Sequence, residues 1–373
     1  MNDACARFLK AKLFMKNNLF CENQQITYTL ANSFFSQNIK TIVKMVLLGL
    51  LALAIILSPV LLLLAAFYRR NLLLLHHKGS RMFQDGRPSF TAELVCIYRA
   101  TSTILGWCND PFAIEFLDWD AQLYVQFVST MKQLAGKKLK LTMTQYLAAR
   151  TSYLDDFVLA GNSEQIVILG AGLDSRAYRL RHLLKKNVKI YEVDAPATQR
   201  HKKAALERLY TRRPDLFNGA ILEQCVTFVS CDFASNESFV QKLMEKGFDK
   251  SNPNTTVLLE GVASYLVVDD LKKTLQDIAS FAPGTRFAMN CIEDSVRKQS
   301  LVSKLLKNVV GEEWKFAWKA SDNVEEFFSP LGFKVLDYQP FEQVMANLKS
   351  LKNEDAPSRV GNFILACEVT KRD

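Results

Sequence analysis

Three acidic residues each stand directly after a short apolar segment, where their carboxylates can bind a polar ligand. Asp194 follows VKIYEV, Asp232 follows VTFVSC, and Glu260 follows the uncharged run TTVLL. These segments predict buried strands, and a carboxylate at the end of such a strand is unfavourable unless it has a partner. Because ligands of open α/β sheets bind beyond the carboxyl ends of the strands, we expect the three acids to line one site.

A glycine turn in the stretch QIVILGAGLDSRAY is expected at the same edge. The apolar run Ile166–Leu169 predicts a strand covered on both faces, and Gly170 and Gly172 let the backbone turn sharply and approach a ligand. A dinucleotide fingerprint would place a third glycine where Ser175 stands, and the charge of Asp174 would repel a pyrophosphate. A nicotinamide cofactor is therefore disfavoured. The turn suits a nucleoside that lacks phosphates and carries a cationic centre, and S-adenosylmethionine is the common one.

The expected contacts follow from the chemistry of that ligand. The Asp194 carboxylate can accept two hydrogen bonds from ribose hydroxyls, and Glu260 can pair with the methionyl ammonium. Asp232 can accept a bond from the adenine amino group while Phe233 offers ring surface, although a solvated loop acid is the alternative. Asp174 either faces the ammonium or N-caps the next helix.

Six motifs resemble, in the same order, those of the leucine carboxyl methyltransferase family. They are most similar to its bacterial branch of S-adenosylmethionine-dependent methyltransferases, and the resemblance covers roughly Ser89 to the C-terminus. It implies a class I methyltransferase fold, which is Rossmann-like α/β, with S-adenosylmethionine as methyl donor. The motifs are YRATS at 98–102, NDPFA at 109–113, RTSYLDDFVLAG at 150–161, GAGLDSRAYRL at 170–180, YEVDAP at 191–196 and EGVASYL at 260–266.

The resemblance also assigns roles to individual positions. It implies a cofactor contact for Asp194. Arg150 resembles the family arginine that grips the cofactor carboxylate, with a surface helix arginine as the alternative. Arg99 corresponds to an earlier basic position of the family and is a further candidate for cofactor binding.

Methyl transfer does not require a nucleophile from the protein. The sulfonium is an activated donor, so an oxygen acceptor held in line with the methyl group supplies most of what is needed. A carboxylate acceptor is already ionised at pH 7, whereas a hydroxyl acceptor needs a base. Tyr265 is a weak candidate to border the acceptor, and a packed core tyrosine is the alternative.

Strands and helices alternate from Gln165 onward, which predicts a mostly parallel seven-stranded sheet with helices on both faces. The last strand is expected to be antiparallel, because only a loop is predicted between it and the strand before. A helical prelude is predicted over 90–160, and the aromatic segment 291–320 is expected to cap the substrate. We expect strands at 166–170, 188–193, 226–231, 256–260, 285–290, 333–338 and 362–369, and helices at about 175–186, 196–210, 236–246, 269–281 and 322–330.

The N-terminal region differs from the rest in hydropathy. Met45–Phe67 carries no charge and is long enough to cross a hydrocarbon core of about 30 Å, so a transmembrane helix is predicted over 45–68, with a cleaved signal peptide as the alternative. We expect residues 1–44 to be a polar basic arm that is disordered, acts as a weak targeting sequence or is not translated, and 69–89 to be a juxtamembrane linker. Five Lys or Arg lie in the 20 residues after the apolar run, against two, Lys40 and Lys44, in the 20 residues before it. The positive-inside rule therefore places the methyltransferase domain, 90–373, in the cytosol.

Charge and cysteine spacing exclude two further classes of protein. The formal charge is +9, and residues 1–89 hold eleven Lys or Arg against three Asp or Glu, so the remainder carries only +1. Nucleic-acid binding by the domain therefore loses its main support. The eight cysteines include no CxxC pair, so no metal site is expected and a reducing compartment fits.

Residues and resemblance together predict an S-adenosylmethionine-dependent O-methyltransferase. It would transfer the methyl group in line to a carboxylate or hydroxyl of a small or lipid-like acceptor. Two alternatives stay open, which are carboxyl methylation of a protein C-terminus and a non-catalytic, membrane-anchored adaptor that keeps the fold. The acids expected at the site count against the adaptor, because a scaffold has no reason to keep them.

Overall fold

The computed structural model of the chain describes residues 44–45, 90–233, 237–299, 313–319, 321–355 and 361–370. The chain divides into two units, Met1–Tyr68 and Arg69–Asp373, and every element below belongs to the second. The N-terminal arm, the apolar run and the linker lie outside the described residues, apart from positions 44 and 45. No helix in the described part of the chain combines the length and apolar character needed to span a membrane.

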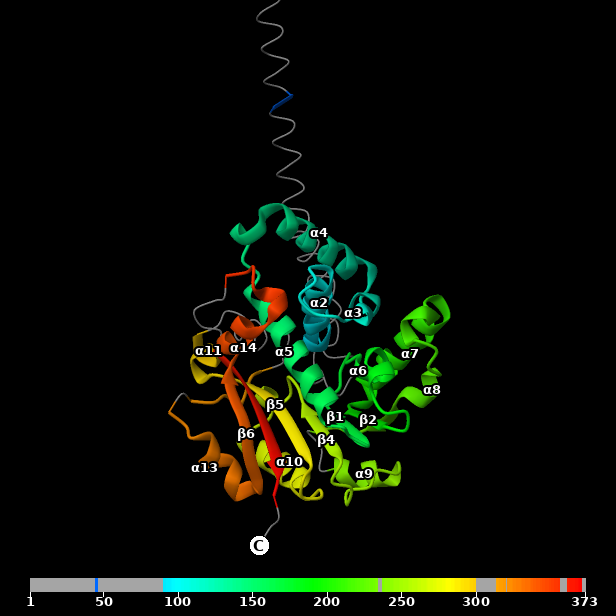
Figure 1. The fold of residues 1–373 in the computed structure, drawn as a ribbon, viewed down its shortest axis with the longest axis vertical. Coiled ribbons are helices and arrows are strands. Elements are labelled where there is room, and N and C mark those ends of the chain that lie inside the picture. Colours follow the sequence, from blue (N-terminus) through cyan, green and yellow to red (C-terminus); the bar gives the residue numbers. More distant parts are fainter. Residues whose placement is uncertain are drawn as a thin grey trace, which may run out of the picture. The chain divides into compact units, whose positions relative to one another are not determined.

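One seven-stranded sheet forms the centre of the domain, in the order β3-β2-β1-β4-β5-β7-β6 (Figure 1). Strands β1 to β5 are parallel to one another, and β7 is antiparallel to both β5 and β6. This confirms the predicted mostly parallel sheet with an antiparallel final strand, the arrangement expected of a class I methyltransferase. The strands are β1 (Gln165–Leu169), β2 (Lys189–Asp194), β3 (Thr227–Ser230), β4 (Thr255–Leu259), β5 (Arg286–Ile292), β6 (Phe333–Pro340) and β7 (Asn362–Val369).

The strand order reverses between β1 and β4, and this reversal creates the ligand edge of the sheet. The two strands pair in register, with Leu169 opposite Leu259, so the residues that follow them lie side by side. All five residues of each strand are buried, which explains why the sequence shows continuous apolar runs there. The edge beyond a reversal of strand order is where open α/β sheets bind ligands.

Helices cover both faces of the sheet because side chains alternate along each strand. Ile166, Ile168 and Leu258 pack with the helical prelude on one face. On the other face, Val167 and Leu259 pack with the helices α9 (Phe239–Glu245), α10 (Val268–Ile278) and α13 (Val324–Phe328). The remaining helices of the described residues are α2 (Phe90–Ile104), α3 (Pro111–Glu115), α4 (Trp119–Ala135), α5 (Thr142–Ala160), α6 (Arg176–Arg179), α7 (Pro196–Arg212), α8 (Leu222–Cys225), α11 (Asp294–Gln299) and α14 (Phe341–Asn347).

Helices α2 to α5 occupy the residues of the predicted helical prelude, and α5 is their central element. It packs against both α2 and α14, and the α2 helix also packs against α3 and α4. Most residues of α5 from Thr144 to Val158 are buried, because neighbours surround the helix. This is how Arg150, in the middle of α5, becomes a buried residue.

Three local predictions differ from the structure. The helix expected over 175–186 is only α6, followed by a 3₁₀ turn at Arg181–Leu183. The loop expected between the last two strands contains α14, whose Phe341 and Met345 are buried. The predicted cap 291–320 begins within β5 and continues into α11, and residues 300–312 and 320 lie outside the described part.

Candidate cofactor site

The glycine turn after β1 needs glycine for a steric reason. Gly170 and Gly172 have φ angles of 64° and 49°, in the left-handed region that side chains disfavour. A Cβ at Gly170 would lie 2.2 Å from Val262 Cγ2, and one at Gly172 would lie 3.3 Å from Ala92 Cβ. The turn is therefore closely packed between the loop after β4 and the start of α2.

Asp194 ends β2 and holds this turn in place. Its Oδ2 accepts a hydrogen bond from the Gly172 N–H at 2.5 Å, and its Oδ1 accepts one from the Ala195 N–H at 2.6 Å. Burial raises the pKa of the Asp194 carboxyl, and these two backbone donors oppose the rise. The predicted strand-end acid thus lies directly against the glycine turn.

Glu260 follows β4 and lies between two arginines. Its Oε1 accepts from Arg150 Nε at 2.7 Å, and its Oε2 accepts from Arg176 Nη1 at 2.6 Å. Burial alone would raise the pKa of Glu260, but the Arg176 and Arg150 guanidiniums outweigh it and hold this pKa well below its usual range. Glu260 is therefore a carboxylate at neutral pH, and two of the predicted site residues, Arg150 and Glu260, are brought into contact.

Arg176 is the centre of the cluster, and its role was missed in the sequence. Its Nε donates to Asp155 Oδ1 at 2.8 Å, and its Nη1 also bonds to Asp174 Oδ2. The Asp174 Oδ1 accepts the Arg176 backbone N–H at 2.7 Å, a local bond made just before α6, whose N-cap residue is Ser175. The sequence feature that could have indicated this role is the position of Arg176, two residues after the acid Asp174 in the glycine turn.

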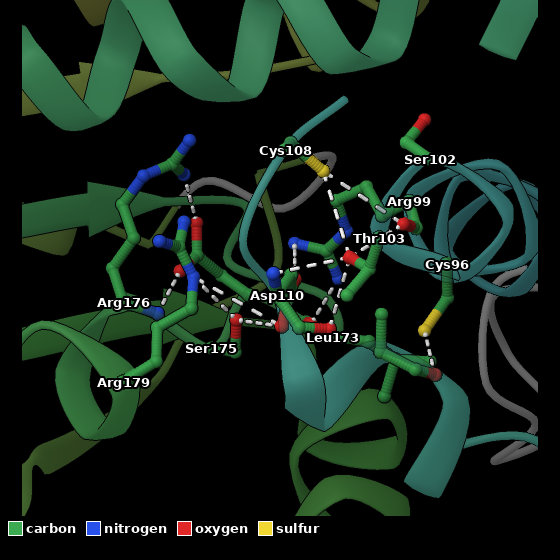
Figure 2. A network of polar contacts seen from close by, with 12 residues as sticks. Cys96, Arg99, Ser102, Thr103, Cys108, Asp110, Leu173, Ser175, Arg176 and Arg179 are labelled. Carbon is green, nitrogen blue, oxygen red and sulfur yellow. Dashed lines mark hydrogen bonds and ion pairs between the residues drawn. The ribbon is translucent and has the colours of Figure 1, made fainter. Parts of the chain in front are cut away.

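A second layer of charges supports the turn from the side of α2, as Figure 2 shows. Arg99 Nη2 donates to the Leu173 carbonyl at 2.5 Å, and Arg99 Nη1 lies 3.4 Å from Asp110. Ser175, which replaces the third glycine of a dinucleotide fingerprint, donates to Asp110 at 2.7 Å and accepts from Arg179 Nε at 3.0 Å. Arg99 therefore holds the turn itself in the described structure.

Four arginines and four carboxylates thus form one buried and charge-balanced network. Within the described residues, Arg176 Nη2 and Arg99 Nε are buried donors without a hydrogen-bond partner. Unsatisfied buried donors of this kind require an explanation, and a ligand oxygen is one. The network consists of Arg99, Arg150, Arg176, Arg179, Asp110, Asp155, Asp174 and Glu260.

The other predicted residues lie around this edge. Asp232 follows β3, whose register brings Ser230 opposite Asp194, and Phe233 packs 6.0 Å from Phe239 between ring centroids. Tyr265 ends the 3₁₀ turn after β4 and is half-buried. None of the described ranges contains a cluster of three His, Cys, Asp or Glu side chains that could hold a metal ion.

The segment 313–319, part of the predicted cap, lies against the loop after β4. The backbone N–H groups of Lys315 and Phe316 both donate to the Ser264 carbonyl, at 2.7 and 3.2 Å. Phe316 and Trp318 also line a small apolar pocket against β5. The segment therefore borders the loop that carries Tyr265, whereas its role as a cap stays a prediction.

A second buried acid of β2 was not given a role from the sequence. Glu192 lies two residues before Asp194 and therefore points to the same side of the strand. Its carboxylate pairs with Lys202 Nζ of α7 at 2.6 Å. Burial raises the pKa of Glu192 to about 7, although Lys202 opposes the rise. Because its partner Lys202 lies on a helix, the sequence indicated this ion pair only by the presence of an acid within an apolar strand.

The residues of this site lie within a segment that matches a known protein family. The family model described as leucine carboxyl methyltransferase matches residues 92–279. The chain belongs to the leucine carboxyl methyltransferase family. This confirms the resemblance found in the motifs, and the matched residues include the glycine turn and all three strand-end acids.

Curated relatives of this family member carry a common name, "Putative S-adenosyl-L-methionine-dependent methyltransferase". One from Mycolicibacterium vanbaalenii is 34% identical over 161 residues, which cover 41% of this chain and 48% of the relative. One from Mycobacterium avium is 28% identical over 240 residues, which cover 60% of this chain and 71% of the relative. The chain thus spans about half the length of the first relative. These names agree with the predicted enzyme class and cofactor.

A solved structure described as "a putative methyltransferase from Thermobifida fusca YX" is similar to this leucine carboxyl methyltransferase family member at 14% identity. The match covers 78% of this chain and 97% of that chain, with a TM-score of 0.47.

Proposed function

We propose that the protein is an S-adenosylmethionine-dependent O-methyltransferase that transfers the methyl group to a carboxylate or hydroxyl of a small or lipid-like acceptor. The observation that carries the proposal is the edge of the sheet between β1 and β4. There the glycine turn, which Asp194 holds from the neighbouring β2, lies beside the buried, charge-balanced network that contains Glu260.

The residues of this edge fit the methyl donor. The methionyl group is a zwitterion, and Arg176 presents a buried donor without a partner, which a carboxylate oxygen would satisfy. Each oxygen of Glu260 accepts one arginine bond and keeps a second lone pair that can receive the ammonium. Asp194 likewise keeps acceptor capacity for ribose hydroxyls, and Asp232 is assigned to the adenine amino group. When bound, the cofactor supplies the activated methyl group, and the chain supplies its position.

A carboxylate acceptor needs least from the protein. It is ionised at neutral pH, so a site that aligns it with the methyl group requires no base. Glu260 does not serve as that base, because two arginines hold its pKa well below its usual range and it has little tendency to accept a proton. Tyr265 stays a candidate to border the acceptor.

Calorimetric titration of the detergent-solubilised full chain with S-adenosylmethionine tests cofactor binding. We expect binding to the wild type, a roughly 10- to 100-fold weaker affinity for Asp194→Asn, and no change for Asp269→Asn, whose carboxylate is exposed on α10. No heat of binding with the intact protein would end the proposal.

Methyl labelling of membrane extracts tests the transfer itself. Labelled products that are lost in mild base are esters, and base-stable products are ethers. Label on a protein C-terminus would favour the protein carboxyl methyltransferase over a small acceptor. Cofactor binding without transfer to any extract fraction would favour the adaptor.

We also propose that residues 45–68 anchor the protein in a membrane with the domain in the cytosol. The support is the uncharged length of this run and the excess of Lys and Arg that follows it. Protease digestion of sealed microsomes should remove the C-terminal domain without detergent. Protection of the domain until detergent is added would overturn the orientation.

A further inference from the structure

The α4 helix turns an apolar stripe away from the domain. Trp119, Leu123 and Leu134 are 66%, 53% and 79% exposed. Their spacings of four and eleven residues put them on one side of the helix, while the buried residues of α4 occupy the other side. The stripe extends about 22 Å along the helix axis. We call Trp119, Leu123 and Leu134 the docking face, and Figure 1 shows α4 lying across the upper end of the domain.

Lysines follow the docking face at the C-terminal end of α4. Lys137, Lys138 and Lys140 are exposed, and no acidic residue occurs anywhere over 121–154. Lys137 lies 3.7 Å from Asp355, whose charge offsets that of Lys137, whereas Lys138 and Lys140 add net positive charge. This end of the helix therefore combines exposed Leu134 with positive charge.

We propose that the docking face binds an anionic lipid bilayer, with its apolar side chains at the hydrocarbon boundary and the three lysines against the headgroups. A helix with an apolar face and flanking lysines binds a membrane interface through these two contributions. Tryptophan is enriched at the same depth. The acids Asp118 and Asp120 lie at the opposite end of the helix, about 22 Å from Leu134. The surface that faces the headgroups is therefore less positively charged at that end.

A bilayer is favoured over another binding partner because a short segment of the chain connects the proposed membrane anchor to the domain that carries α4. This argument rests on the proposed anchor. The apolar run ends at Phe67 and α2 begins at Phe90, so the intervening 22 residues span at most about 75 Å. The α2 helix packs directly against α4. A surface held this close to a bilayer can dock even when its intrinsic affinity is weak, because its effective concentration at the membrane is high.

Tryptophan quenching tests the contact. The full chain is reconstituted in nanodiscs of phosphatidylcholine alone, or with 30% phosphatidylserine, in which the phosphatidylcholine carries bromine on its acyl chains. Of the four tryptophans, Trp107 and Trp318 are buried. We expect bromolipid to quench a component of the emission more strongly with phosphatidylserine, and Trp119→Phe to lose that component. Absence of Trp119 quenching in protein that is retained in the nanodisc would overturn the proposal.

Two matched pairs of variants separate charge and apolar contacts. Replacement of Lys137, Lys138 and Lys140 by Gln should weaken partition of the protein onto vesicles with 30% phosphatidylserine by about 100-fold, if each lysine contributes its usual share. The same charge change at the exposed Lys185, Lys186 and Lys246 should have little effect.

For the apolar contacts, Leu123→Gln with Leu134→Gln should reduce quenching of Trp119, whereas Ile221→Gln with Met244→Gln, at exposed positions outside α4, should not. Equal effects of test and control variants would overturn the proposal.

Two further results distinguish the failure of this proposal from the failure of the anchor. Protein that does not stay in nanodiscs would refute the anchor. Binding of the docking face to lipid would then be judged from the partition onto vesicles alone. Shielding of Trp119 that depends on protein concentration in lipid-free detergent would identify a second copy as the occupant and would overturn the lipid proposal.

Discussion

Arg176 bonds three buried carboxylates, so its replacement should show how much the network contributes to the free energy of unfolding. Arg176→Met keeps an apolar side chain of similar length but leaves Asp155, Asp174 and Glu260 without this partner. Removal of one member of a buried ion pair typically destabilises a protein by about 3–5 kcal/mol, because the remaining charge stays desolvated. This is a large fraction of the roughly 5–15 kcal/mol that stabilises a folded domain.

The loss should depend on pH in a defined direction. The pKa of Glu260 in the folded protein is depressed, so the stabilisation by Arg176 is present above the unfolded value of about 4.3 and is lost as the pH falls through the folded value. Without Arg176, the pKa of Glu260 rises. We therefore expect the deficit to be largest at pH 7 and to shrink toward pH 4, where protonation removes the uncompensated charge.

Urea unfolding of the detergent-solubilised full chain, followed by tryptophan fluorescence at both pH values, measures this effect. The matched control is Arg213→Met, which removes an exposed arginine paired with Asp215 and should change the unfolding midpoint little. Arg176→Met combined with Glu260→Gln should cost less than the sum of the two changes. The reasoning is refuted if Arg176→Met destabilises no more than the control, or if its deficit is equal at both pH values.

Three other predictions concern the turn and β2. Gly170→Ala should destabilise the domain and abolish S-adenosylmethionine binding, because the new Cβ would meet Val262 at 2.2 Å in a left-handed conformation; thermal melting and calorimetry would show this, and unchanged binding would contradict it. Asp194→Asn should retain the fold by circular dichroism while weakening cofactor binding, so a global loss of structure would indicate a purely structural acid. Burial raises the pKa of Glu192 to about 7, so ionisation of Glu192 should lower stability as the pH rises from about 4.3 toward 7. In Glu192→Gln this slope should decrease, as measured by urea midpoints, and an unchanged slope would show that Lys202 keeps the carboxylate ionised throughout.

Most of the sheet could be predicted from the sequence because its strands are buried on both faces. Each central strand then appears as a continuous apolar run, and an acid or glycine marks its end. The elements that were missed lack this signal. The sequence of α14 mixes apolar and polar residues, and contact with α5 accounts for its buried face. The short α6 was overestimated because its arginines are consistent with a longer helix, whereas buried ion pairs engage them in the structure.

The sequence alone determined the family, the positions of the glycine turn and the strand-end acids, because these depend on local residue types and short spacings. Only the tertiary structure decided which charges meet. Arg176 and Glu260 are 84 positions apart, and their contact exists because β1 and β4 pair in parallel and in register at the point where the strand order reverses. It also decided that the side of α4 with Trp119 and Leu134 is left exposed, because the other side of the helix packs against the prelude. Local sequence specifies which elements form, whereas long-range packing specifies which of their faces meet one another and which meet solvent.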